Sequence, residues 1–174
     1  LEDGKLTGKA MMALDSCNAD FILIGVDLTT LAVIRREADG ATINRLLTTD
    51  ATRCSSEIIL DGVSPEAIFE AAGSTIQSML QAGRIALAAD TLGACESMIE
   101  QAVAYAQQRK QFDRTIGSFQ AVKHMCAEMI ADLEPARSLL WYSAHSFNAM
   151  PDEVALMSGH TLAHTSEIGR NIAS

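Results

Sequence analysis

The sequence predicts an α+β fold in which a partial antiparallel β-sheet precedes an up-and-down α-helical bundle. The first third contains short apolar runs with no helix-length segment between them for parallel crossovers. The remainder contains long stretches in which apolar residues recur at steps of three and four. Aromatic residues make up only 5% of the 174 residues, whereas Ala, Leu, Ile and Met are plentiful, which favours close helix packing.

The predicted strands are short apolar runs bounded by turn residues. They cover residues 21–26, 31–34, 41–47 and 56–60. Asp39-Gly40 is the clearest hairpin signal in the chain and is predicted to join the second strand to the third. We therefore predict a partial β-domain over residues 1–63 and a helical domain over residues 64–174.

The first long helix is predicted over residues 75–111, a stretch without proline. A helix of this length rarely stands alone in a globular domain, so the sequence predicts a bundle. The stripe expected to face the core consists of Ile76, Met79, Leu80, Gly83, Leu87, Thr91, Ala94, Met98 and Ala102.

A second helix is predicted over residues 119–149, and Pro135 within it is expected to bend it locally. Pro151 then begins a third helix whose first turn is acidic, as the helix dipole favours. The apolar face predicted for the second helix consists of Val122, Met125, Cys126, Met129, Leu133, Ala136, Leu140 and Phe147.

Charge and composition exclude several classes of function. A net charge of -9 without a dense Lys/Arg run argues against nucleic-acid binding. No apolar run reaches the roughly 20 residues that a membrane span requires. Four widely spaced cysteines predict free thiols in a reducing cytoplasm rather than disulfides.

The chain starts with Leu1 and stops within a helical pattern, so we expect it to be a piece of a longer protein.

The junction between the first two helices, residues 104–120, is the candidate binding region. Polar and aromatic side chains crowd there around a short turn expected at Gly117, where they do not disturb the core. An alternative is that Arg109 and Gln111 merely cap the end of the first helix.

The junction belongs to a longer pattern. It runs Tyr105-Ala-x-x-Arg109-x-Gln111-Phe112-x-x-x-Ile116-x-x-Phe119-Gln120-x-x-x-His124-x-x-Ala127-Glu128-Met129. This pattern resembles the signature of the flavin-dependent acyl-CoA dehydrogenases, in which an Arg-x-Gln-Phe-Gly turn joins two long helices of the C-terminal bundle. The likeness extends back through residues 82–93. It continues more weakly into the strands, which are similar to the second half of the family's middle β-domain.

The resemblance implies FAD as cofactor, an acyl-CoA thioester as substrate and α,β-dehydrogenation. In such enzymes a glutamate takes the α-proton, the β-hydrogen leaves as hydride to the flavin, and an electron-transfer flavoprotein accepts the electrons. It also implies a homo-oligomer, a dimer or tetramer, or a heteromeric assembly.

Individual residues match functional positions of the family. Arg109, Gln111 and Phe112 match positions that contact FAD, commonly the FAD of the neighbouring subunit, and Phe119 and Gln120 match a second such contact. Arg84 matches an arginine near the acyl-CoA pocket. An ion pair at the edge of the core is the alternative for that residue.

The chain also departs from the family. Residues 12–14 are Met-Ala-Leu where many members have a Trp-x-Thr that touches the flavin, and Asp113 replaces the usual glycine. Gly83 occupies the position where one branch carries the catalytic glutamate, and in most members that glutamate lies beyond the equivalent of Ser174. No catalytic residue is therefore assigned, and these residues alone are expected to be inactive.

Two alternative functions stay open. One is a non-catalytic partner subunit that completes the FAD site of a sister subunit. The other is a helical interaction module without flavin.

The spacing His160-x-x-x-His164-x-x-Glu167 suits a zinc site, but no further ligand is evident and no metal is predicted. His124 and Glu128 are interpreted as an i,i+4 helix pair.

Overall fold

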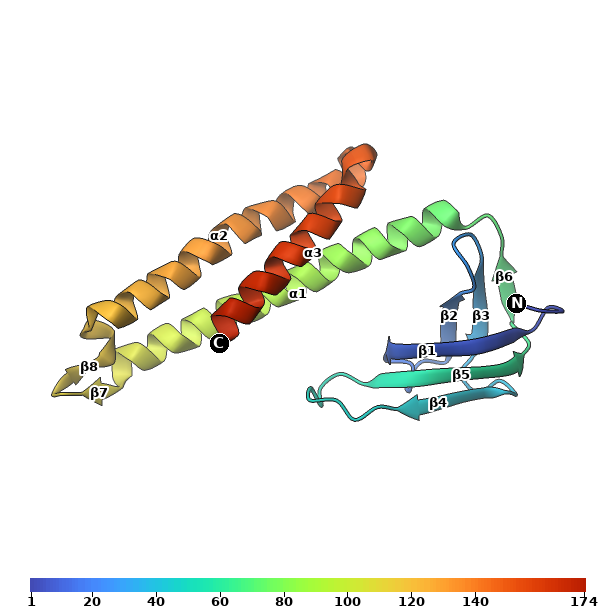
Figure 1. Ribbon diagram of the computed structural model, residues 1–174, viewed down its shortest axis with the longest axis horizontal. Coiled ribbons are helices and arrows are strands. Elements are labelled where there is room, and N and C mark those ends of the chain that lie inside the picture. The colour runs from blue at the N-terminus through green and yellow to red at the C-terminus, as the bar shows by residue number, and fades with distance from the viewer. The chain divides into compact units, whose positions relative to one another are not determined.

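A computed structural model describes residues 1–174, which form two compact units, Leu1–Gln77 and Ser78–Ser174 (Figure 1). The first unit contains antiparallel sheets and the second a bundle of helices, so the predicted α+β class is confirmed. None of the helices is both long enough and apolar enough to cross a lipid bilayer.

The first unit packs two three-stranded antiparallel sheets against each other. One has the order β1-β5-β4 and the other β2-β3-β6. The strands are β1 (Leu6–Leu14), β2 (Phe21–Gly25), β3 (Leu31–Arg35), β4 (Ala41–Arg45), β5 (Ser55–Val63) and β6 (Ala67–Phe69). Alternate residues of each sheet point inward and form one core, as strand geometry requires. The core consists of Leu6, Ile22, Ala32, Ile34, Ile58, Leu60 and Val63.

The four predicted strands correspond to β2, β3, β4 and β5, whereas β1 and β6 were not predicted. Most side chains of β1 are exposed, so it lacks the alternation of apolar and polar residues that marks a half-buried strand. Its pairing with β5 is also irregular, because the register shifts between Ala10 and Ala13. The third missed feature is the division of the strands into two sheets rather than one.

The predicted hairpin at Asp39-Gly40 is wrong. β3 pairs with β2 and β6, while β4 pairs with β5, so this turn carries the chain from one sheet to the other. Gly40 has φ +85°, and its carbonyl oxygen accepts a hydrogen bond of 2.9 Å from the backbone of Asp61. A Cβ at Gly40 would overlap the carbonyl oxygen of Asp61. Glycine is therefore needed for the close approach to β5 as well as for the turn.

The second unit is a three-helix bundle. Its helices are α1 (Gly73–Gln108), which begins in the first unit, α2 (Gln120–Ala149) and α3 (Pro151–Ala173). In Figure 1, α2 runs back along α1 and α3 returns beside α2. The bounds agree closely with the predicted helices. The core consists of Leu92, Cys95, Ile99, Leu133, Ala136 and Ile168.

The stripe predicted to bury α1 is confirmed at Met98, which packs against the bundle core, and is wrong in its first half. Met79, Leu80 and Leu87 are each about half exposed, and no atom lies within 4 Å of a Cβ built on Gly83. The face that packs against the other helices instead consists of Ala88, Leu92, Cys95, Ile99 and Ala106. Apolar residues surround α1 on almost every side, so the spacing of three and four fits two faces and cannot distinguish between them.

The face predicted for α2 is confirmed in its central part. Leu133 and Ala136 are buried, and Met129 and Leu140 pack against the same core. Pro135 lies inside α2 as predicted, and the helix continues through it. An ion-pair bridge also links the first two helices, because the Arg137 guanidinium lies 3.1 Å from Glu96 on α1 and 3.3 Å from Glu134.

The α2–α3 interface is lined by small hydroxyl side chains. Its buried polar residues are Ser143, Ser146, Ser158, Thr161 and Thr165. The Ser143 hydroxyl donates to the Met157 carbonyl oxygen at 3.0 Å and lies 2.5 Å from the Thr161 hydroxyl. The other hydroxyls donate to carbonyl oxygens of their own helices. Small side chains with satisfied hydroxyls let the two backbones approach closely without a penalty for burying polar groups.

The connection between α1 and α2 is a small hairpin followed by one helical turn. Strands β7 (Lys110–Gln111) and β8 (Arg114–Thr115) pair, and the 3₁₀ turn η1 (Ile116–Ser118) leads into α2. The predicted turn at Gly117 is thus only the last part of the connection. A Cβ on Gly117 would lie 2.9 Å from the Ala106 carbonyl oxygen near the end of α1. The connection folds back onto α1 at this glycine.

We predict that Gly117→Ala destabilises the bundle by about 1–3 kcal/mol, because the added methyl group meets backbone atoms that cannot move aside. Gly93→Ala is the matched control, since nothing lies within 4 Å of a Cβ there and alanine favours the helix by up to about 1 kcal/mol. Urea unfolding monitored by circular dichroism measures both free energies. Equal stability of the two variants would contradict the close approach at Gly117.

A second substitution tests the α2–α3 interface. Ser143→Leu forces a large side chain between two closely packed backbones and removes the bond to Met157, so we expect a loss of about 1–3 kcal/mol in the free energy of unfolding. Ser138→Leu, at an exposed position of the same helix, should change it by less than about 0.5 kcal/mol. Thermal unfolding of the two variants side by side gives the comparison.

Titration of the Tyr142 phenol tests the contact between α2 and α3. Tyr142 donates a 2.6 Å hydrogen bond to the Glu153 carboxylate, which raises the pKa of the phenol above its usual value, with partial burial acting in the same direction. The stabilisation from this hydrogen bond is therefore complete below the ordinary tyrosine pKa. It is lost as the pH rises through the raised pKa of Tyr142. In a Tyr105→Phe background, Glu153→Gln should lower the titration midpoint seen by ultraviolet absorbance. An unchanged midpoint would show that the bond is absent.

Candidate functional site

Two polar side chains at the junction have no partner within the chain. Arg109 directly follows α1, and its backbone N–H donates to the Tyr105 carbonyl oxygen at 2.9 Å, which continues the helical pattern by one residue. Gln111 lies in β7. Both side chains are exposed and neither makes a hydrogen bond or ion pair, so neither caps the helix. They are free to bind a ligand.

Two aromatic rings and a second arginine lie beside these donors. The rings of Phe112 and Phe119 meet edge to face with centroids 6.1 Å apart. The Arg114 guanidinium lies over the Phe119 ring, 4.0 Å from its centroid, as in a cation–π contact. Phe112 is 85% exposed, which is unusual for so large an apolar side chain. Arg114 was missed in the sequence, because its contact with Phe119 depends on the 3₁₀ turn η1 that lies between the two residues.

The backbone at the tip of the hairpin fixes the direction of these side chains. Phe112 and Asp113 both have positive φ, +54° and +61°, and together form the two-residue loop between β7 and β8. Two-residue hairpins of this kind need left-handed conformations, for which glycine, asparagine and aspartate are best suited. The Asp113 departure is therefore compatible with the turn, while the left-handed Phe112 carries the strain.

The remaining predicted site residues lie at different distances from this hairpin. Gln120 begins α2, and its amide nitrogen lies 3.1 Å from the His124 ring, so His124 pairs with Gln120 rather than with Glu128 as predicted. Arg84 lies roughly 37 Å from Arg109 along α1, from the helical rise of about 1.5 Å per residue. It is exposed and makes no ion pair. The structure brings together the five junction residues and leaves Arg84 apart.

In the first unit, the end of β1 presents apolar side chains to the outside. Met12 is 60% exposed at φ +58°, and Leu14 is 57% exposed. The irregular pairing between Ala10 and Ala13 accompanies this left-handed residue. These are the positions where the sequence departs from the Trp-x-Thr pattern, and they are accessible on the surface of this unit.

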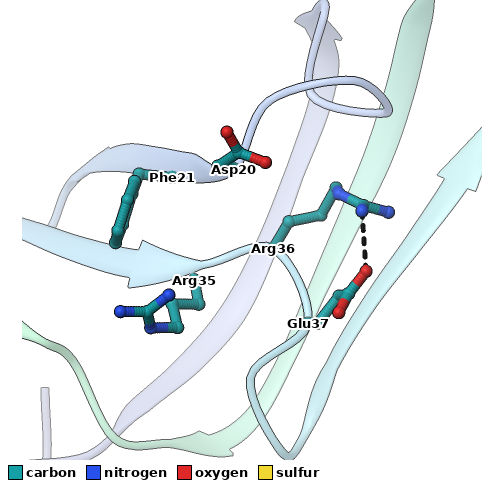
Figure 2. A pocket seen from close by; sticks show the side chains of 5 residues that line it. All are labelled: Asp20, Phe21, Arg35, Arg36 and Glu37. Atoms are coloured by element: carbon teal, nitrogen blue, oxygen red, sulfur yellow. Dashed lines mark hydrogen bonds and ion pairs between the residues drawn. The ribbon is translucent and has the colours of Figure 1, made fainter.

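A pocket on the first unit contains two arginines that are already engaged (Figure 2). Arg36 contacts Glu37 at 2.7 Å, and the Arg35 guanidinium lies 4.9 Å from the centroid of the Phe21 ring. Arg35 also pairs with Glu66 at 2.8 Å. Because both guanidinium groups have carboxylate partners, this pocket is a weaker candidate for binding an anion than the junction.

Other titratable groups of the bundle have structural partners or lack a site. Glu96 and Glu134 pair with Arg137, and Glu153 accepts from Tyr142. His160, His164 and Glu167 line one shallow pocket with Leu139 and Ala163. No group of three or more His, Cys, Asp or Glu side chains is arranged to hold a metal ion.

The junction thus combines uncommitted donors with flat apolar surfaces. A guanidinium offers fixed N–H donors to phosphate oxygens, and an amide can pair with a hydroxyl or a ring heteroatom. Phenylalanine rings can pack against a planar ligand. The titratable side chains beside them, Asp113 and His124, share no hydrogen bond, and the His124 ring is paired with the Gln120 amide. The arrangement suits binding of an anionic, partly planar molecule rather than catalysis by the junction itself.

Comparisons with known proteins agree with this architecture. The family model "Acyl-CoA dehydrogenase, C-terminal domain" matches residues 73–168. The chain is 35% identical over 98 residues to an acyl-CoA dehydrogenase of Mycobacterium tuberculosis, covering 56% of this chain and 13% of that protein. It is 30% identical over 157 residues to a 3-sulfinopropanoyl-CoA desulfinase of Paraburkholderia xenovorans, covering 89% of this chain and 37% of that protein.

Solved structures share the fold. Butyryl-CoA dehydrogenase of Megasphaera elsdenii superposes with a TM-score of 0.86 at 23% identity, over 98% of this chain and 49% of that chain. The present chain thus spans about half the length of this structure, and 13% and 37% of the two curated relatives.

The family match covers both sides of the junction, from the start of α1 to near the end of α3. Proteins of the matched family are FAD-dependent flavoproteins. On the family match and on the fold, the chain belongs to the acyl-CoA dehydrogenase family.

Proposed function

We propose that this chain is part of an FAD-dependent acyl-CoA dehydrogenase that catalyses α,β-dehydrogenation of an acyl-CoA thioester. Within it, the junction holds part of an FAD molecule, commonly that of the neighbouring subunit. The observation that carries the proposal is the pair of uncommitted donors, Arg109 and Gln111, beside two phenylalanine rings at the β7–β8 hairpin.

The donor set fits the cofactor. FAD carries a pyrophosphate, ribityl hydroxyls and two planar ring systems. In this proposal Arg109 binds the pyrophosphate, since guanidinium–phosphate bonds are charge-assisted, and Gln111 binds a hydroxyl or ring atom. Phe112 and Phe119 supply flat surfaces, and Arg114 holds the Phe119 ring in place. When bound, FAD supplies the acceptor for the hydride.

The proposal assigns proton removal to a residue outside these 174. Position 83, which carries the base in one branch of the family, is glycine, and glycine has no group that accepts a proton. Glu96 and Glu153 make an ion pair and a hydrogen bond between helices, and Glu134 pairs with Arg137 within α2. The chain's own role is therefore to bind and orient, and alone it should be inactive.

Substrate and partners follow from the same proposal. Arg84 contacts the acyl-CoA, an electron-transfer flavoprotein takes the electrons, and the protein works in a reducing cytoplasm, which the four free cysteines support. The name of the desulfinase relative also refers to a CoA thioester, but not to dehydrogenation. A CoA thioester as substrate is therefore better supported than α,β-dehydrogenation as the reaction.

The proposed protein is a homo-oligomer, a dimer or tetramer. The half-exposed Met79, Leu80 and Leu87 on α1, with the small Gly83 among them, support this part of the proposal. An uncovered apolar face of this kind marks an interaction surface, and a site shared between subunits requires such an assembly.

A second candidate is a non-catalytic partner subunit that completes the FAD site of a sister subunit. The departures at Met12, Leu14, Gly83 and Asp113 favour it. Both candidates use the junction in the same way and differ in whether this protein performs chemistry of its own.

The experiment uses the protein purified from the cells that produce it, together with any subunits that accompany it. We expect Arg109→Ala to weaken FAD binding by roughly tenfold to a hundredfold, the usual effect of losing a hydrogen bond to a charged group. FAD content by absorbance and acyl-CoA-dependent reduction of an electron-transfer flavoprotein are the measurements. Arg170→Ala, at another exposed arginine, is the matched control and should leave both unchanged.

The outcomes separate the candidates. FAD retention and turnover by one kind of subunit support the enzyme, whereas turnover that requires a second kind of subunit supports the partner. A protein that retains no FAD in either form overturns both and supports a helical interaction module. Turnover by residues 1–174 alone would contradict the claim that essential groups lie elsewhere.

A further inference from the structure

Two cysteines far apart in sequence meet at one end of the β1–β5 ladder. Leu14 pairs with Ser55, and the Asp15 N–H then donates to the Cys54 carbonyl oxygen at 2.8 Å, so Cys54 directly precedes β5 at the point where β1 ends. The backbone turns back after Asp15, since the Asn18 N–H donates to the Asp15 carbonyl oxygen at 2.9 Å. Cys17 lies inside this turn.

The Ser56 hydroxyl lies beside the Cys17 thiol. Its oxygen is 2.8 Å from the Cys17 sulfur. Cys54 and Ser56 are two residues apart on an extended backbone, so their side chains lie on the same face of it. Both thiols therefore lie beside one hydroxyl, at the same end of the β1–β5 ladder.

The surroundings shift the pKa values of the two thiols in opposite directions. Hydrogen bonds from Ser56 and then from Cys54 lower the pKa of Cys17, and the charges of Arg45 and Arg36 act in the same direction. The hydrogen bond with Cys17, followed by burial, raises the pKa of Cys54. Cys17, which is half-buried, therefore ionises more readily than the buried Cys54.

We propose that Cys17 and Cys54 form a reversible oxidation site, at which a peroxide converts the two thiols into an intramolecular disulfide. The site lies wholly in the first unit and does not depend on the junction or on FAD. Its reactive partner is a small peroxide such as H₂O₂, which can reach the half-buried Cys17.

The chemistry balances in two steps. The Cys17 thiolate attacks one peroxide oxygen, the O–O bond breaks, and hydroxide leaves and takes a proton to become water. The Cys54 sulfur then attacks the Cys17 sulfenic acid, the S–S bond forms, and the hydroxyl group leaves as a second water with the Cys54 proton. The two thiols lose two electrons and the peroxide gains them.

The other two cysteines provide internal controls. Cys95 is fully buried in the core of the bundle, where burial raises its pKa, and Cys126 is half-buried on α2. Neither has a second thiol beside it in the structure. Exposure alone does not separate Cys17 from Cys126, so any difference in their behaviour reports on the Ser56 and Cys54 contacts.

The experiment treats the reduced protein with H₂O₂, blocks the remaining thiols with an alkylating reagent and maps the peptides by mass spectrometry. We expect loss of two of the four free thiols, one linked peptide pair containing Cys17 and Cys54, and full recovery with dithiothreitol. Cys126→Ser should form the same linked pair. Cys54→Ser should leave a sulfenic acid on Cys17 that a dimedone probe captures.

The unaltered protein decides the question even if a variant fails to fold. Oxidation of Cys17 to sulfinic acid without a linked peptide would overturn the proposal, because it would show that Cys54 cannot reach it. So would consumption of Cys126 as fast as Cys17, because the contacts around Cys17 would then confer no reactivity. The assay contains no substrate and no flavin, so its outcome is independent of the proposed function.

Discussion

The close approach of Gly117 to the Ala106 carbonyl oxygen determines where the candidate site lies. The chain must leave α1, form a hairpin and enter α2 within residues 109–119. Only a residue without Cβ lets the 3₁₀ turn lie this close to the end of α1. The Ile116 N–H donates to the Arg109 carbonyl oxygen at 2.8 Å and closes the base of the hairpin. The exposed rings and donors therefore project from a rigid support, as a binding site requires.

The sequence predicted the class of fold, the three long helices and four of the six strands β1–β6. Each of these elements has a clear periodicity or turn signal. It failed where two arrangements satisfy the same pattern. α1 offers apolar residues on more than one face, and the choice of Leu92 and Cys95 over Met79 and Leu80 depends on α2 and α3. The Asp39-Gly40 turn is real, but which strands pair across it depends on tertiary packing.

The candidate site was predictable to a similar degree. The five junction residues were chosen from a linear motif, and the structure places them at one junction, while their binding role stays a prediction. The Arg114–Phe119 contact and the left-handed pair Phe112–Asp113 depend on a two-residue hairpin that carries no Asn-Gly or Asp-Gly signal. The approach of Cys17 to Ser56 and the neighbouring Cys54 joins distant positions, so no local pattern could predict it. The polar lining of the α2–α3 interface was also missed, since hydroxyl residues count as surface residues in any hydrophobic periodicity.

The hydroxyl-lined interface has a mechanical consequence. Directional bonds between α2 and α3 are concentrated near Met150, where Ser143 reaches Met157 and Thr161 and Tyr142 reaches Glu153. Farther along α3, the Thr165 hydroxyl bonds only within its own helix, and Gly169 lies against Thr91 of α1 by shape alone. α3 is therefore anchored at its first turns and held by packing at its last. Local opening of α3 from its last turns would therefore break packing contacts before any hydrogen bond to α2.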